Sequence, residues 1–153
     1  MEVEQAKSNT KSELIDKLLE FSIDEITEDY LKIYDITKEK VEEVIKSKIS
    51  ANCLSVVYKE KEPIAYVCYK DEGDRIRMMF WAVKKEYRDQ SLHLFMVDKI
   101  EEEARKKEKD FMYMVIHRME HKLIMTAIRK GWRYLGGKNE VILVKILRRR
   151  SNG

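Results

Sequence analysis

The spacing of hydrophobic residues along the chain changes near Cys53. Before this point apolar residues recur every three or four positions, which is typical of the buried face of an α-helix. The pattern predicts three helices: one that begins near Ser12, one over residues 28–34 and one after Thr37. Ser12 and Thr37 are expected to cap their helices, because a hydroxyl can accept a hydrogen bond from an unpaired amide of the first turn. The positions expected to face inward are Leu14, Ile15, Leu18, Leu19, Val41, Val44, Ile45 and Ile49.

Strands are predicted in the middle of the chain. The segments Cys53–Lys59 and Pro63–Lys70 are rich in β-branched and aromatic residues, and three polar residues join them, which predicts a β-hairpin. A third strand is expected over residues 76–83. Helical spacing returns over residues 92–107, and a short apolar strand follows at 111–116. This strand, helix and strand are expected to form a βαβ unit with parallel strands and a right-handed crossover.

The C-terminal part adds a helix and two strands. A helix over residues 120–130 is expected to end at Gly131, because glycine readily adopts the left-handed conformation that terminates many helices. Strands are expected over residues 132–135 and 141–147. The order of elements predicts an α+β fold with a mixed central β-sheet flanked by helices. The inward positions of the helix are expected to be Leu123, Ile124, Ala127 and Ile128.

One domain is expected to account for most of the chain. A length of 153 residues with 44% hydrophobic residues suits a single buried core. We predict a single domain over residues 11–147, between a disordered N-terminus at residues 1–10 and a basic tail at residues 148–153. Methionines on the two central strands are expected to form an adaptable part of the core; they are Met78, Met79, Met112 and Met114.

Charged residues make up 39% of the chain, with 31 basic and 28 acidic residues interleaved. The formal net charge of +3 is too small to indicate nucleic-acid binding by itself. We therefore interpret the charges as a solvated surface, and a nucleic-acid partner is not expected.

Segments that would direct the chain to a membrane are not apparent in the sequence. No apolar stretch reaches the roughly 18–20 residues that a membrane-spanning helix needs, and residues 1–10 lack the apolar region of a signal peptide. We expect a cytoplasmic protein without a membrane partner. Cys53 and Cys68 are interpreted as reduced core residues, and since they do not have metal-ligand spacing, no metal site is expected.

Residues 80–96 carry the strongest functional signal. A strand of the buried type runs through a short polar turn into an amphipathic helix. The first amides of a helix have no intrahelical partner, so this arrangement can bind an anion. The amides of residues 88–93 are expected to form the binding nest. Alternatively, Asp89 or Ser91 caps an ordinary helix and nothing binds there.

This segment resembles the acetyl-CoA loop of the GNAT-type N-acetyltransferase family. The residues that match the pattern of the family are Val83, Tyr87, Arg88, Leu92 and Met96. Gly131-Trp132 is similar to the Gly-Phe pair that precedes the last two strands in the family. The resemblance covers residues 50–147 and implies a GNAT-like fold with a strand-loop-helix-strand core.

The sequence departs from the family pattern at several functional positions. Lys85 replaces a usual proline, and Ser91 and His93 replace usual small residues. Ala127 stands where the family commonly has a tyrosine that protonates the departing thiolate of coenzyme A, and Glu120 stands where it has an asparagine. The acetyl-CoA loop and the active site are therefore degenerate relative to the family.

The resemblance implies acetyl-CoA as co-substrate and an amine as acceptor, either a small molecule or a protein. The amine would attack the thioester directly, and the acetyl group would move from coenzyme A to the nitrogen. The residues that the resemblance and the loop assign to acetyl-CoA binding are Trp81, Val83, Arg88, Asp89, Gln90, Ser91, Leu92 and His93.

Two residues are candidates for catalysis. His117 follows the second parallel strand, and an imidazole titrating near neutrality can serve as general base for the attacking amine. His121 is a reserve candidate. Tyr113 could donate a hydrogen bond from the same strand. Alternatively, both histidines are polar loop or helix residues, and Tyr113 is a core aromatic.

A second function is consistent with the altered residues. The missing hydroxyl at Ala127 and the degenerate loop would suit a catalytically inactive GNAT-fold module with a binding, regulatory or virion-associated role in a phage or mobile element. Binding of acetyl-CoA, weakened by Arg88→Ala, would distinguish the enzyme from such a module. A homodimer is left open by the sequence.

Overall fold

The computed structural model describes residues 1–6, 12–25, 35–90 and 92–148. Its strands are β1 (Glu2–Gln5), β2 (Leu54–Lys59), β3 (Glu62–Asp71), β4 (Arg75–Val83), β5 (Phe111–His117), β6 (Arg133–Leu135) and β7 (Glu140–Ile146). Its helices are α1 (Ser12–Glu25), α3 (Lys38–Ser50), α4 (Leu92–Lys106) and α5 (His121–Arg129), with a 3₁₀ helix η1 (Lys85–Gln90). The helix predicted over residues 28–34 lies outside the described residues.

The strands form a mixed sheet with the hydrogen-bonded order β1-β2-β3-β4-β5-β7-β6. Neighbouring strands of known register are antiparallel except for β4 and β5, which are parallel. The predicted α+β class with a mixed sheet and flanking helices is confirmed. In the described ranges, none of the helices has both the length and the apolar character that crossing a membrane requires.

Two compact units make up the structure. The first consists of Met1–Tyr69 and Phe80–Lys99, and the second of Lys70–Met79 and Ile100–Gly153. The boundaries between the units therefore fall inside β3, inside β4 and inside α4. The single domain predicted over residues 11–147 stays a prediction, and each unit is described by itself below.

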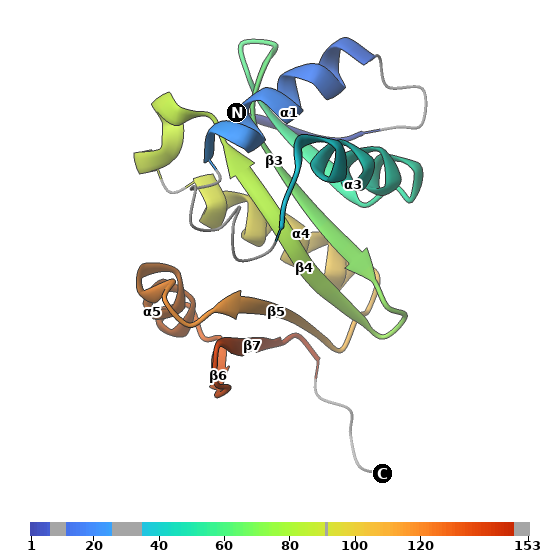
Figure 1. The fold of residues 1–153 in the computed structure, drawn as a ribbon. Helices are drawn as coiled ribbons and strands as arrows, with labels where there is room; N and C mark the ends of the chain where they lie inside the picture. Colours follow the sequence, from blue (N-terminus) through green and yellow to red (C-terminus); the bar gives the residue numbers. More distant parts are fainter. Residues whose placement is uncertain (7–11, 26–34, 91, 149–153) are drawn as a thin grey trace. The chain divides into compact units, whose positions relative to one another are not determined.

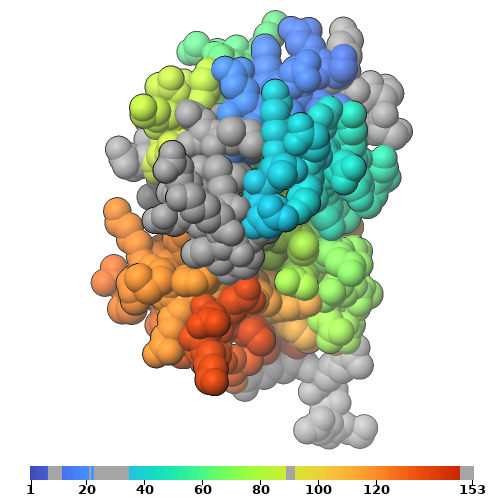
Figure 2. All heavy atoms as spheres, viewed as in Figure 1, coloured from blue at the N-terminus to red at the C-terminus, as the bar shows by residue number. Residues whose placement is uncertain are grey.

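The core of the first unit lies between two helices and the sheet. Figure 1 shows α1 and α3 side by side in front of β3, and their spheres, blue and teal, also adjoin in Figure 2. Leu18, Ile45 and Tyr66 are fully buried in this core. The buried hydroxyl of Ser22 donates to the Leu18 carbonyl at 2.6 Å and also bonds with the Tyr66 hydroxyl, so its polar atom is satisfied.

Three features of the first unit differ from the expectation. Glu2 to Gln5, within the segment expected to be disordered, form β1 and pair with β2 from Glu2↔Tyr58 to Gln5↔Ser55. Val44, expected to face inward, is 36% exposed. The hairpin turn contains only Glu60 and Lys61, because Glu62 already pairs with Lys59.

The second unit contains the parallel pair of strands. Arg75 to Met78 of β4 pair with Phe111 to Met114 of β5, which confirms the predicted strand-helix-strand arrangement. β7 lies between β5 and β6 and is antiparallel to both. Gly131 has a φ of +93° and follows α5, as predicted from its sequence position.

Two apolar side chains expected in the core of the second unit are partly exposed instead. Met79 is 37% exposed, since strand alternation places it on the face opposite the buried Met78. Ile128 of α5 is 40% exposed, while Ile124 and Ala127 are buried. Met112 and Met114 are buried, as expected.

Candidate acetyl-CoA loop and active-site residues

The polar turn after β4 folds as the 3₁₀ helix η1, and the whole segment from Phe80 to the first turns of α4 belongs to the first unit. The Lys84 amide donates to the Ile64 carbonyl at 2.8 Å, and the Tyr87 amide donates to the Lys84 carbonyl at 2.8 Å. In a 3₁₀ helix each amide bonds to the carbonyl three residues before it. The Tyr87 amide therefore has a partner within the chain, and amides suited to an anion are expected at the start of α4.

Arg88 is held in a defined position at the end of β4. Its Nε donates to the Val83 carbonyl oxygen at 3.1 Å, and the side chain is half-buried. This bond ties η1 back to the strand that precedes it. Since a guanidinium remains charged at all physiological pH values, the bond fixes a permanent positive charge in the turn.

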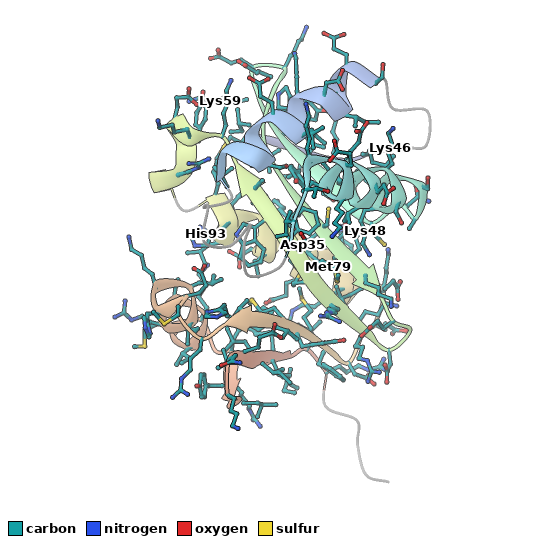
Figure 3. The ribbon with its side chains drawn as sticks, in the orientation of Figure 1. Asp35, Lys46, Lys48, Lys59, Met79 and His93 are labelled. Carbon is teal, nitrogen blue, oxygen red and sulfur yellow. The ribbon has the colours of Figure 1, made fainter. Side chains whose placement is uncertain are left out.

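The other residues predicted for acetyl-CoA binding occupy different environments. Val83 and Leu92 are buried and connect the turn to the core. Trp81 is half-buried on β4, and His93 is half-buried in the first turn of α4, where Figure 3 labels it. Asp89 and Gln90 belong to η1, but their side chains lie outside the described part of the chain, as does all of Ser91.

Two basic side chains near the turn were not anticipated from the sequence. Lys59, labelled in Figure 3, places its Nζ 5.3 Å from the ring centre of Tyr87. Lys84 forms an ion pair with Glu62 at 2.8 Å, which lowers the pKa of that carboxyl and raises the pKa of the lysine. Neither contact has a local sequence signal, because the partners are 22 or more residues apart.

Tyr113 lies on β5 in the second unit, and its hydroxyl is engaged. It donates to Oε1 of Glu72 at 2.5 Å, and this hydrogen bond is the main reason why the pKa of Tyr113 is raised. The same bond lowers the pKa of Glu72. Glu72 was missed from the sequence, since only the pairing of β4 with β5 brings the turn at residues 71–74 close to Tyr113.

His117 is the last residue of β5 and is half-buried. Its Nδ1 accepts a hydrogen bond from the Met119 amide at 3.1 Å. In the neutral imidazole one ring nitrogen donates and the other accepts, so the proton is on Nε2 in this geometry. His117 would have to release the Met119 amide before Nδ1 could take a proton from an amine.

The helix after β5 contains the positions that the resemblance compared with a tyrosine and an asparagine of the family. Ala127 is buried in α5, and Glu120 and His121 are exposed at its start. Glu120 is the N-cap residue, but its side chain makes no capping hydrogen bond. Within the part of the chain that the structure describes, no cluster of three or more His, Cys, Asp or Glu residues could hold a metal ion.

The candidate residues thus form two groups. The first unit brings together Val83, Arg88 and Leu92 around the turn from β4 to α4. The second unit contains Tyr113 and His117 at different points of β5, and each has a hydrogen-bond partner inside that unit.

Comparisons with solved structures show the fold. PaiA N-acetyltransferase from Thermoplasma acidophilum, in complex with coenzyme A, is 15% identical with a TM-score of 0.70, and the match covers 95% of this chain and 98% of that one. Ribosomal-protein-alanine N-acetyltransferase from Brucella melitensis is 15% identical with a TM-score of 0.73, over 96% and 100% of the chains. A GNAT-family acetyltransferase from Listeria monocytogenes is 14% identical with a TM-score of 0.72, over 95% and 94%.

Sequence comparisons show the family. A search of curated proteins found no significant match. The family model described as the acetyltransferase (GNAT) family matches residues 14–123, which is well over half of the chain. The chain therefore belongs to the GNAT acetyltransferase family.

Proposed function

We propose that the protein transfers an acetyl group from acetyl-CoA to an amine. Family membership over residues 14–123 is the observation that carries this proposal. The turn from β4 to α4 supports it, because strand, turn and helix have the order that places helix amides near a bound phosphate. The phage-module alternative has no comparable support.

The charges of the first unit suit the diphosphate of acetyl-CoA. Arg88 is fixed at the strand end by its bond to Val83, and Lys59 adds a second positive charge to the same unit, whereas the charge of Lys84 is balanced by Glu62. A diphosphate near the first amides of α4 would be attracted by these cations and by the helix dipole. The half-buried His93 would restrict close approach of the phosphates, yet could pair with them when protonated.

The transfer itself needs a free amine, a base that takes a proton from the nitrogen, and a proton for the departing sulfur. The amine nitrogen forms a bond to the thioester carbon, the carbon–sulfur bond breaks, and the sulfur leaves as a thiolate that takes up a proton. The ammonium nitrogen that results must lose a proton to a base. Correct placement of the two reactants can account for much of the acceleration, because it replaces a bimolecular encounter.

His117 remains the candidate base in this proposal. The hydrogen bond from the Met119 amide occupies its Nδ1, the ring nitrogen that would have to accept the proton. As placed, the neutral ring presents Nε2–H, which cannot accept a proton. Movement of residues 118–119 would release Nδ1. Tyr113 is less suited to protonate the thiolate, because its hydroxyl donates to Glu72 and its pKa is raised.

An acetyl-transfer assay tests the proposal directly. Purified protein would be mixed with acetyl-CoA and a panel of amines: a polyamine, an aminoglycoside, and peptides with a free N-terminus or a lysine. Released coenzyme A would be followed with a thiol reagent. Burial raises the pKa of Cys68 far above its usual range, so this thiol should react slowly. Acetylated product from any amine supports the proposal; no product, together with no acetyl-CoA binding, contradicts it.

A further inference from the structure

Basic residues are concentrated in the part of the second unit that lies between β5 and β7. Residues 118–139 contain six basic residues and one acidic residue, which leaves 25 of the 31 basic and 27 of the 28 acidic residues for the rest of the chain. All six basic residues are exposed; they are Arg118, Lys122, Arg129, Lys130, Arg133 and Lys138. The net charge of +3 therefore combines a strongly positive segment with a slightly negative remainder.

The same segment exposes hydrophobic side chains. Among the described residues, ten large hydrophobic side chains are clearly exposed, and five of them lie within residues 118–139. Met119 is 70% exposed, Met125 is 50% exposed and Ile128 is 40% exposed. Exposed apolar side chains gathered in one place and bordered by charge are typical of an interaction site.

Helix α5 places basic and apolar side chains on the same side. Lys122 and Arg129 are seven residues apart, which is about two helical turns, and Met125 lies between them. Ile124 and Ala127 are buried, so they mark the opposite, inward side of the helix. Figure 3 shows nitrogen- and sulfur-containing side chains that project from α5 away from β5.

The turn that precedes α5 extends this surface. Arg118 and Met119 are exposed directly before the helix, and Nη1 of Arg118 donates to the Lys138 carbonyl at 3.4 Å. This bond brings the loop before β7, with its own lysine, beside the start of α5. We call the result the α5 surface, defined by Arg118, Met119, Lys122, Met125, Ile128 and Arg129.

The cations of the α5 surface are not neutralised by neighbouring carboxylates. Arg118, Lys122 and Arg129 form no ion pair with any residue that the structure describes. Elsewhere in the same unit, by contrast, Arg148 pairs with Asp110 at 3.2 Å. Like charges that are held close together without counter-charges create a positive potential, which attracts an anionic partner.

We propose that the α5 surface binds the surface of a bilayer that contains anionic lipids. The basic side chains contact the lipid headgroups, while Met119, Met125 and Ile128 enter the boundary between headgroups and acyl chains. The expectation of no membrane partner came from the missing membrane-spanning stretch, and binding at the bilayer surface needs no such stretch. The inference is independent of acetyl transfer, because it uses neither the turn before α4 nor His117.

Two other partners account for only part of the α5 surface. Nucleic acid would neutralise the basic residues, but single strands also stack their bases on aromatic rings, and α5 contains no Phe, Tyr or Trp. The exposed methionines would then have no role. A second copy placed symmetrically would bring the same basic residues toward one another. An anionic bilayer accounts for both the charge and the apolar side chains.

Co-sedimentation with lipid vesicles tests this proposal. One set of vesicles contains phosphatidylcholine alone, and the other contains roughly 30% anionic phosphatidylglycerol. The charge variant is Lys122→Glu with Arg129→Glu. Its matched control is Lys38→Glu with Lys107→Glu, which changes the net charge equally at two exposed positions outside the α5 surface.

The apolar part of the surface has its own variants. Met125→Ser removes the central methionine, and Met125→Leu keeps an apolar side chain of similar size. An oligo(U) strand added as competitor represents nucleic acid. Thermal melts establish that each variant is folded.

We expect the wild type to bind the anionic vesicles and not those of phosphatidylcholine alone. The charge variant should bind about thirtyfold more weakly, since each basic residue near the bilayer contributes roughly fivefold. Met125→Ser should weaken binding about fivefold, whereas Met125→Leu and the control pair should bind like the wild type.

Four results would overturn the proposal. They are the absence of binding to anionic vesicles, an equal loss in the control pair, unchanged binding by Met125→Ser, and displacement of the vesicles by oligo(U). The last two would assign the α5 surface to a soluble polyanion, because the methionines would then contribute nothing.

Discussion

The hydrogen bond between Tyr113 and Glu72 gives a pH-dependent contribution to stability at the residue scale. The pKa of Glu72 is lowered in the folded protein, so its contribution is present above the unfolded pKa and is lost as the pH falls. The pKa of Tyr113 is raised, so its contribution is present below the unfolded pKa and is lost as the pH rises. We expect Tyr113→Phe to lower the free energy of unfolding by about 1 kcal/mol near neutral pH.

Denaturant unfolding across pH checks this prediction. The difference between the wild type and Tyr113→Phe should shrink below about pH 4 and above about pH 10, where one partner has changed its charge. The exposed Tyr134 of β6 offers a control, and Tyr134→Phe should show no such profile. A constant difference for Tyr113→Phe at all pH values would mean that the ring packing, and not the hydrogen bond, is what the substitution removes.

The His117 tautomer gives a second test at the residue scale. With Nδ1 accepting from the Met119 amide, the neutral ring should carry its proton on Nε2. Nitrogen NMR chemical shifts of the ring distinguish the two tautomers. His121, which is exposed at the start of α5, serves as the internal reference. A proton on Nδ1 in the neutral state would contradict the described geometry and leave Nε2 available as a base.

At the scale of elements, the start of α3 depends on one side chain. The Thr37 hydroxyl oxygen accepts from the Lys40 amide at 3.2 Å. We expect Thr37→Ala to lower the free energy of unfolding by about 1 kcal/mol, because a first-turn amide loses its partner. Ser47→Ala in the same helix is the control and should slightly stabilise it. Thermal or denaturant unfolding measures both, and equal effects of the two substitutions would contradict the capping role.

The turn between β2 and β3 contains removable backbone strain. Glu60 has a φ of 51° and Lys61 a φ of 67°, a pair of left-handed residues that a two-residue hairpin turn requires. Replacement by Asn-Gly at these positions should raise the free energy of unfolding by about 1 kcal/mol, because glycine adopts this conformation without a Cβ clash. Lys59→Gly, one residue earlier in β2, should destabilise instead. A loss of stability with Asn-Gly would contradict the assigned turn.

Sequence patterns predicted elements whose signals are local and missed those that depend on distant pairing. The Thr37 cap, the termination at Gly131 and the βαβ unit all follow from neighbouring residues. β1 was missed because Glu-Val-Glu-Gln is a short, polar segment, and its partner β2 lies about fifty residues further along the chain. Met79 was placed in the core by its type, although strict alternation from the buried Met78 predicts the opposite face.

From the sequence, only those parts of the candidate site that belong to a local motif could be predicted. The turn after Val83 and the position of Arg88 follow from the strand-turn-helix pattern. The bond from Arg88 Nε to the Val83 carbonyl and the contact of Lys59 with Tyr87 depend on backbone geometry and on the adjacent hairpin. Glu72 could have been found as the partner of Tyr113 only by first aligning β4 with β5.

For the whole molecule, family membership supports the proposal of acetyl-CoA as co-substrate, while the departures from the family pattern that the sequence indicates stay a prediction. Ala127 lacks a hydroxyl, and His93 adds bulk at the start of α4. Binding and catalysis can therefore fail separately. In the proposed function, acetyl-CoA binding uses residues of the first unit, whereas transfer also needs a base and an acceptor amine.

The most direct test is the thermal unfolding of the protein with and without acetyl-CoA. A ligand at about 100 times its dissociation constant should raise the free energy of unfolding by roughly 2.7 kcal/mol. We predict a clear upward shift for the wild type and for Arg129→Ala, and a smaller shift for Arg88→Ala. A cooperative melt that acetyl-CoA leaves unchanged would contradict the account, because the turn from β4 to α4 would then not bind the co-substrate.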